Sequence, residues 1–115
     1  MKSNIILEKS YAFAVRIVKL YQYLYKEKKE FVLSKQILRS GTSIGANAEE
    51  AVGGISKKDF RAKMSIAYKE ARETEYWLRL LNDTDILDDK LFTSLHDENK
   101  ELLKILFTII KSSKD

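Results

Sequence analysis

The sequence predicts an all-α protein, an up-down-up-down antiparallel four-helix bundle formed by residues 1–115 as a single domain. The chain has no proline and only four glycines, which does not suit the many tight turns of a β-sandwich or barrel. Four segments repeat their apolar residues at steps of three and four, the spacing of a helix that faces a core. The 115 residues suffice for one modest core, and the connections between the four segments are short, as in a bundle.

The first two helices are expected at about residues 4–28 and 31–52. The core positions of the first are Phe13, Ile17, Leu20 and Leu24. The charged run KEKKE at 26–30 ends this helix. The core positions of the second are Leu33, Ile37, Ser40, Ile44, Asn47 and Ala51. Gly53 and Gly54 follow directly and are expected to stop the second helix with a positive φ.

The other two helices are expected at about residues 57–82 and 89–112. Ser56 with Asp59 three residues later resembles a capping box for the third. Its core positions are Phe60, Met64, Ala67, Ala71, Thr74, Leu78 and Leu81. The core positions of the fourth are Phe92, Leu95, Asn99, Leu102, Leu106 and Ile109. Two acidic residues before the fourth helix can cap it and complement its dipole, namely Asp88 and Asp89.

Four of these core positions are polar, namely Ser40, Asn47, Thr74 and Asn99. An unsatisfied polar group inside a core costs kilocalories, so these side chains are expected to bond one another or backbone carbonyls. Their expected benefit is the specificity of register and topology rather than catalysis.

The first two helices carry more apolar or small surface than one core needs. A second stripe of the first helix lies roughly 150° from its core positions and consists of Tyr11, Val15, Val18 and Tyr25. The second helix has a small-residue seam beside its core stripe, made of Gly41, Gly45, Ala48 and Val52. Glycine inside a helix costs about 1 kcal/mol relative to alanine, which indicates a close approach there. We interpret both as an oligomer interface; the alternative is packing inside one chain.

The net charge of +4 is unevenly distributed. Residues 1–82 carry 16 basic and 9 acidic side chains, net +7, whereas residues 83–115 carry 5 and 8, net −3. The third helix contributes a basic ridge, and the candidate nucleic-acid-binding residues on this helix are Lys57, Lys58, Arg61, Lys69, Arg72 and Arg79. Such a ridge favours an anionic partner such as RNA or DNA. The alternative is structural ion pairing, with Glu75 or with a neighbouring subunit.

Catalytic and metal sites find no support in the sequence. There is no cysteine, and His96 is the one histidine, so a thiolate or multi-histidine metal site is excluded. His96 is followed by Asp97 and Glu98 and is expected to be a solvated surface side chain. The acidic pairs Glu49/Glu50 and Glu70/Glu73 are expected to form ion pairs with nearby bases, namely Arg39, Lys69 and Arg72. No nucleotide-binding motif occurs, so neither an enzyme nor a cofactor is expected.

No segment approaches the ~20 apolar residues of a membrane span, and the start of the chain lacks a long apolar run. No contact with a membrane is therefore expected. The absence of cysteine fits a reducing compartment, and the expected location is the cytoplasm.

The chain closely resembles the bacterial 23S rRNA-intervening-sequence proteins. The likeness covers SYAFAVRIVKLYQYL at 10–24, LSKQILRSGTSIGANAEEA at 33–51 and SKKDFRAKMSIAYKEARETEYWLRLL at 56–81. The matching positions of the second segment are Arg39, Ser40, Gly41, Thr42, Ser43, Ile44, Gly45, Asn47, Glu49, Glu50 and Ala51. Those of the third are Ser56, Phe60, Lys63, Ala67, Lys69, Glu70, Ala71, Glu73, Thr74, Tyr76, Trp77 and Leu78.

The resemblance implies a left-handed bundle that assembles as a homopentamer. It also implies kinship with the accessory variability protein of diversity-generating retroelements, which is similar in fold and binds nucleic acid through a basic surface. The family name refers to genes inside insertions of ribosomal RNA, which is a genomic location rather than an activity. The expectation is thus a non-enzymatic oligomer that binds RNA or DNA. The alternative is a scaffold that docks a protein partner without touching nucleic acid.

Overall fold

The computed structural model describes residues 2–113, and side chains from residue 4 onward. Four helices account for nearly all of this part of the chain: α1 (Lys2–Lys26), α2 (Leu33–Val52), α3 (Lys57–Asp83) and α4 (Asp89–Ser112). Their bounds agree with the predicted ranges to within about two residues, which confirms the all-α four-helix prediction.

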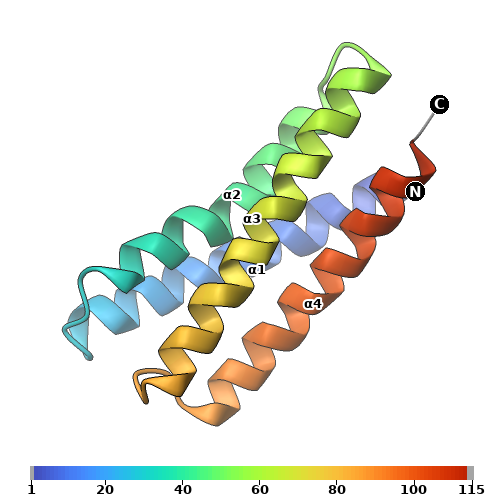
Figure 1. The fold of residues 1–115 in the computed structure, drawn as a ribbon. Coiled ribbons are helices and arrows are strands. Elements are labelled where there is room, and N and C mark those ends of the chain that lie inside the picture. The colour runs from blue at the N-terminus through green and yellow to red at the C-terminus, as the bar shows by residue number, and fades with distance from the viewer. Residues whose placement is uncertain (1, 114–115) are drawn as a thin grey trace.

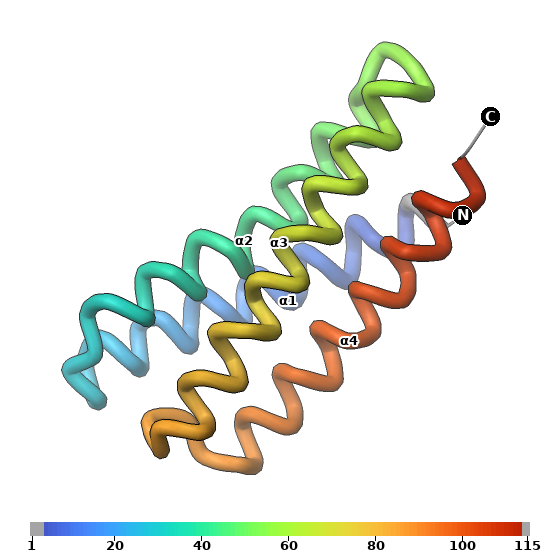
Figure 2. Tube along the Cα trace, in the orientation of Figure 1, coloured from blue at the N-terminus to red at the C-terminus, as the bar shows by residue number. Residues whose placement is uncertain are grey.

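Consecutive helices run in opposite directions and form an elongated bundle of 46 × 20 × 19 Å (Figure 1). Each helix packs against its neighbours in sequence, and α1 packs against α4 to close the ring. Helices α1 and α3 are therefore diagonal to each other and do not pack together. Both ends of the chain and the α2–α3 connection lie at one end of the bundle, whereas the other two connections lie at the opposite end (Figure 2).

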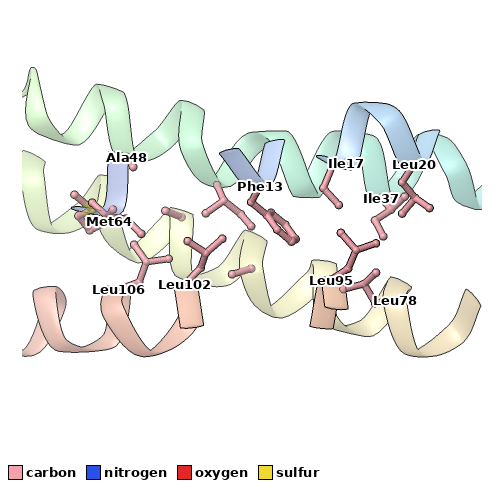
Figure 3. Close-up of a cluster of buried hydrophobic side chains, with 14 of the residues drawn as sticks. Phe13, Ile17, Leu20, Ile37, Ala48, Met64, Leu78, Leu95, Leu102 and Leu106 are labelled. Carbon is pink, nitrogen blue, oxygen red and sulfur yellow. The ribbon is translucent and has the colours of Figure 1, made fainter. Parts of the chain in front are cut away.

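The core runs along the axis of the bundle and takes apolar side chains from all four helices (Figure 3). Side chains from the four helices that illustrate it are Phe13, Ile17, Ile37, Ala48, Met64, Leu78, Leu95 and Leu102. All of them are buried at the positions that the spacing of three and four residues predicts, Ala48 on the predicted seam and the others on the core stripes. Burying a large apolar side chain such as Phe, Leu, Ile or Met stabilises the fold by about 1.5–3 kcal/mol. Because the buried positions recur with the period of the helix, the spacing of apolar residues locates the helices.

The predicted polar core positions find partners inside the bundle. The Thr74 hydroxyl donates to Ser40 Oγ at 2.9 Å across the α2–α3 contact, and both side chains are buried. Asn99 Nδ2 donates to the Ala71 carbonyl at 2.9 Å, which links α4 to α3. Asn47 is only half-buried and donates to the Ser43 carbonyl of its own helix. The prediction of mutual and backbone bonding is confirmed for these donors, whereas the buried Oδ1 of Asn99 has no hydrogen-bond partner among the described residues.

The predicted caps of α3 and α4 are present. Ser56 Oγ accepts from the Asp59 amide at 3.0 Å, and Asp88 accepts from the Leu91 amide at 2.8 Å. The start of α2 is capped by a residue that the sequence did not single out, since the Glu30 carboxylate accepts from the amides of residues 32–34.

The prediction of a positive φ after α2 is wrong. Gly53 has a φ of −83°, and no described glycine has a positive φ. The left-handed residues are instead Lys29 and Asp85, in the two other connections. A Cβ on Gly54 would lie 3.0 Å from the Ala51 carbonyl oxygen and would displace the Asp59 carboxylate, so glycine relieves crowding at this turn.

The small-residue seam of α2 packs inside the chain against α1. A Cβ on Gly41 would lie 2.8 Å from two side-chain carbons of Ile17, and one on Gly45 would lie 3.3 Å from Ser10 Oγ. Gly41, Gly45 and Ala48 are buried in the single chain. Their assignment to an oligomer interface is therefore wrong, because α1 already covers them; only Val52 of the seam is exposed.

Candidate nucleic-acid interface

All six predicted nucleic-acid-binding residues are exposed on α3. They are Lys57, Lys58, Arg61, Lys69, Arg72 and Arg79. The core side of this helix, at Met64, Ala67 and Ala71, is fully buried. At 100° per residue the cations lie on the opposite or lateral side, where neither α2 nor α4 covers them.

Most of these cations have no anionic partner. Arg79 Nε lies 3.8 Å from the Glu75 carboxylate one turn earlier, as the alternative of structural pairing anticipated. For the other five, no carboxylate within the part of the chain that the structure describes lies within ion-pair distance. Arg72, which could have paired with Glu75 at helical spacing, does not do so.

The first turns of α3 and the end of α4 border an open cleft of about 520 Å³. Its lining comes from Lys57, Lys58, Arg61, Ala62, Ser65 and Ser113. Cations in the first turn of a helix oppose its dipole, at a cost of about 0.3–1 kcal/mol each. An anion in this cleft would offset that cost, and three of the six predicted binding residues line it.

Helix α4 extends the basic surface, which the sequence analysis missed. The rings of Tyr68 on α3 and Phe107 on α4 are in contact, with centroids 6.3 Å apart. Lys100, Lys104 and Lys111 stand seven and three residues before Phe107 and four after it, so they share its face of α4. All three are exposed.

The acidic residues of α4 explain why this surface was missed. Glu98 pairs with Arg16 and Glu101 lies 3.4 Å from Lys9, so both are directed toward α1. The net charge of residues 83–115 also includes four aspartates around the α3–α4 connection, at positions 83, 85, 88 and 89, so it does not describe the outward side of α4. We call the six α3 cations together with the three α4 lysines the basic face: Lys57, Lys58, Arg61, Lys69, Arg72, Arg79, Lys100, Lys104 and Lys111.

Three of the four predicted glutamates are paired with bases: Glu70 and Glu73 with Arg39, as predicted, and Glu50 with Lys63, a base that the prediction did not name. Arg39 bonds Glu70 at 3.2 Å and also contacts Glu73, while Trp77 Nε1 donates to Glu73 at 2.9 Å. The Trp77 hydrogen bond and then the Arg39 contact lower the pKa of Glu73 below its ordinary value. The bond to Glu73 is likewise the main cause that raises the pKa of Arg39.

A second bridge on the same side joins Lys63 to Glu50 at 2.8 Å, and it raises the pKa of Lys63. Lys69 and Arg72 take no part in these pairs. Among the described residues, no three histidine, aspartate or glutamate side chains gather closely enough to hold a metal ion.

The prediction that His96 is a solvated surface side chain is wrong. The side chain is half-buried rather than solvated, and its ring stacks on Phe92 with centroids 4.9 Å apart. Its Nε2 is buried and has no hydrogen-bond partner among the described residues. The charged neighbours of His96 in the sequence did not reveal this, because residues adjacent in a helix point in different directions.

The second apolar stripe of α1 is exposed in the single chain. Tyr11 is 71% exposed, and Val15, Val18 and Tyr25 are each exposed by about two fifths. We call these four residues the apolar stripe. Within residues 2–113, no helix combines the length and the apolar content that a bilayer crossing requires.

Comparison with known proteins gives the same family as the sequence motifs. The family described as 23S rRNA-intervening sequence protein matches residues 2–108. A crystal structure from Bacteroides thetaiotaomicron, of a protein with unknown function from the S23 ribosomal protein family, is 54% identical to this chain. The likeness covers 96% of this chain and 99% of that one, with a TM-score of 0.95. No curated protein matches. With its motifs, its four helices and this match over nearly its whole length, the chain belongs to the 23S rRNA-intervening sequence protein family.

Proposed function

We propose that the chain is a non-enzymatic subunit of a homo-oligomer that binds RNA or DNA through the basic face. The observation that carries the proposal is the row of exposed cations on α3 that have no ion pair within the described part of the chain, of which Arg61 and Arg72 are central. Ion pairs do form where α3 faces α2, between Arg39 of α2 and Glu70 and between Lys63 of α3 and Glu50, so the paired and the free cations lie on different sides of α3.

The electrostatics of the basic face favour a polyanion over a single small anion. The cations extend from Lys57 to Arg79, which is about 33 Å along a helix with a rise of 1.5 Å per residue. Phosphates along a nucleic-acid strand can meet such a row together, and each contact releases condensed counterions. The expected binding is salt-dependent and tolerant of sequence.

The apolar stripe supports the oligomeric half of the proposal. Its four side chains are exposed along α1 between residues 11 and 25, and gatherings of exposed apolar side chains are typical of contacts between proteins. Since α1 and α3 are diagonal in the bundle, the apolar stripe and the α3 cations lie on different sides of the subunit. The resemblance to the family favours a pentamer.

The test is the affinity of a labelled RNA hairpin, which offers both a duplex stem and a single-stranded loop. The double reversal Arg61→Glu/Arg72→Glu should weaken binding on the order of tenfold or more. The matched control is Lys26→Glu/Lys35→Glu, which makes the same change in charge at exposed positions near the α1–α2 connection. Equal affinities for the two double variants, with circular dichroism showing both folded, would refute the proposed interface.

The alternative is a scaffold that docks a protein partner without direct contact with nucleic acid, and the apolar stripe is the observation that favours it. Pull-downs with and without nuclease separate the two functions. A protein partner that persists after nuclease treatment supports the scaffold, whereas a partner lost with the nucleic acid supports the proposal.

A further inference from the structure

Phe107 is an unusual residue on the basic face. It is 56% exposed, and no other large apolar side chain of α4 in the described residues is exposed to this degree. The core side of α4 is supplied by Leu102, Leu106 and Ile109, which are all buried. Packing of the bundle therefore does not account for an aromatic ring at position 107.

A single exposed apolar residue is common on protein surfaces and by itself indicates nothing. Two further observations distinguish Phe107. Its ring contacts Tyr68 at 6.3 Å between centroids, with the planes inclined by 48°. Tyr68 is partly buried and packed against the core, so it holds one edge of the aromatic pair in place. The pair bridges α3 and α4 in the middle of the basic face.

Cations flank the aromatic pair on both helices at equal sequence offsets, which run in opposite directions because α3 and α4 are antiparallel. Arg61 and Arg72 stand seven residues before and four after Tyr68, and Lys100 and Lys111 stand seven before and four after Phe107. Each row spans about 16 Å along its helix. Cations on both sides of an exposed ring are the combination with which proteins hold single strands, where the phosphates meet the cations and a base stacks on the ring.

We infer that the nucleic acid bound by the basic face is single-stranded, with one base stacked on Phe107. This inference rests on the proposed function. It adds that the bound base must be unstacked from its neighbours. A duplex offers no such base, because its bases are stacked inside the helix. A row of cations without the ring would bind duplex and single strand through phosphates alone.

The probes are a labelled oligouridine of about 15 nucleotides and its duplex with oligoadenine, titrated in the same buffer. The full chain should bind the single strand more tightly than the duplex. The substitution Phe107→Ala should weaken single-strand binding roughly 5- to 150-fold. Duplex affinity should not change, and the salt dependence should stay the same because no phosphate contact is lost.

Two variants at the same position separate stacking from packing. Phe107→Trp keeps an aromatic face and should retain single-strand affinity, whereas Phe107→Leu keeps the apolar volume and should lose it as Phe107→Ala does. If Leu restored affinity, or if Phe107→Ala lowered the oligomer mass in sedimentation velocity, Phe107 would be a protein contact and the inference would be overturned.

The failure of the inference and that of the proposed function give different results. Equal binding of both probes, unaffected by Phe107→Ala but weakened by Arg61→Glu/Arg72→Glu, would overturn the stacked single strand and leave the basic face intact. Absence of binding to either probe by the unmodified protein would refute both.

Discussion

Helices α1 and α3 have the same length to within two residues and bury the same kind of stripe, yet their outer surfaces differ in chemistry. The outer side of α1 exposes the apolar stripe, whereas that of α3 exposes cations without partners. A bundle helix needs only about a third of its circumference for the core. The remaining surface is therefore free to differ between helices, and the proposed function assigns the outer side of α1 to contact with protein and that of α3 to contact with a polyanion.

The largest effect should come from placing charges on the apolar stripe. The double variant Tyr11→Glu/Val18→Glu should dissociate the oligomer completely at micromolar concentration in sedimentation velocity, because a carboxylate inside an apolar contact costs several kcal/mol. Both side chains are exposed in the single chain, so circular dichroism should show an intact fold. The control is Lys35→Glu on α2, which should leave the mass unchanged. A stable monomer of the unmodified protein would contradict the account of α1.

A substitution at the contact between the inner side of α1 and α2 should change the stability of the fold rather than the mass of the oligomer. The substitution Gly41→Ala places a Cβ 2.8 Å from Ile17, which is fully buried, and overpacking of this kind costs about 1–3 kcal/mol. The gain in helix propensity of about 1 kcal/mol offsets part of this cost. We expect a net loss of roughly 0.5–2 kcal/mol in the free energy of unfolding, measured by urea denaturation.

Gly53→Ala is the matched control for Gly41→Ala. Its Cβ would lie 3.7 Å from the nearest atom, and the φ of Gly53 suits alanine. The control should change stability by less than about 0.5 kcal/mol. If Gly41→Ala proved as stable as Gly53→Ala, the seam would not pack against α1 as described.

The smallest effect on stability should come from the ion pairs between α3 and α2, such as the pair of Glu73 and Arg39. The pKa of Glu73 is lowered in the folded state, so its contribution to stability is fully present above the ordinary value of about 4.5. That contribution is lost as the pH falls through the lowered pKa of the folded state. Glu73 and Arg39 are both partly exposed, so the increment is about 1 kcal/mol or less.

Glu73→Gln should therefore lower the free energy of unfolding at pH 7 and converge with the unmodified protein at acidic pH, as measured by urea denaturation across pH. Glu49→Gln, at an exposed glutamate without an ion pair among the described residues, should show no such pH-dependent difference. A difference between Glu73→Gln and the unmodified protein that stays constant from pH 7 to below pH 4 would contradict the linkage.

The helices and the core could be predicted because burial repeats with the period of the helix. Phe13, Ile17 and Leu24 are buried for the same reason that their spacing marks a helix. The caps at Ser56 and Asp88 were equally visible, since capping depends on residues a few positions apart.

The positions that could not be predicted lie beside the core stripes. There the helical period does not say which neighbour a side chain faces. Gly41 lies beside the core stripe, and a position there can face α1 or a second subunit with the same periodicity. The lysines of α4 were hidden because the charge of a segment sums over sides that face α1 and solvent. His96 shows the same difficulty, because its sequence neighbours and its spatial neighbour Phe92 differ in character.

The salt dependence of RNA binding tests the central claim most directly. For the unmodified protein, the logarithm of the binding constant should fall linearly with the logarithm of the salt concentration. Neutralising two contacts with Arg61→Gln/Arg72→Gln should reduce the slope by about 1.4, or 0.7 for each phosphate contact on a single strand. An affinity independent of salt, or a slope that the double variant leaves unchanged, would contradict the claim that α3 presents its free cations to a polyanion.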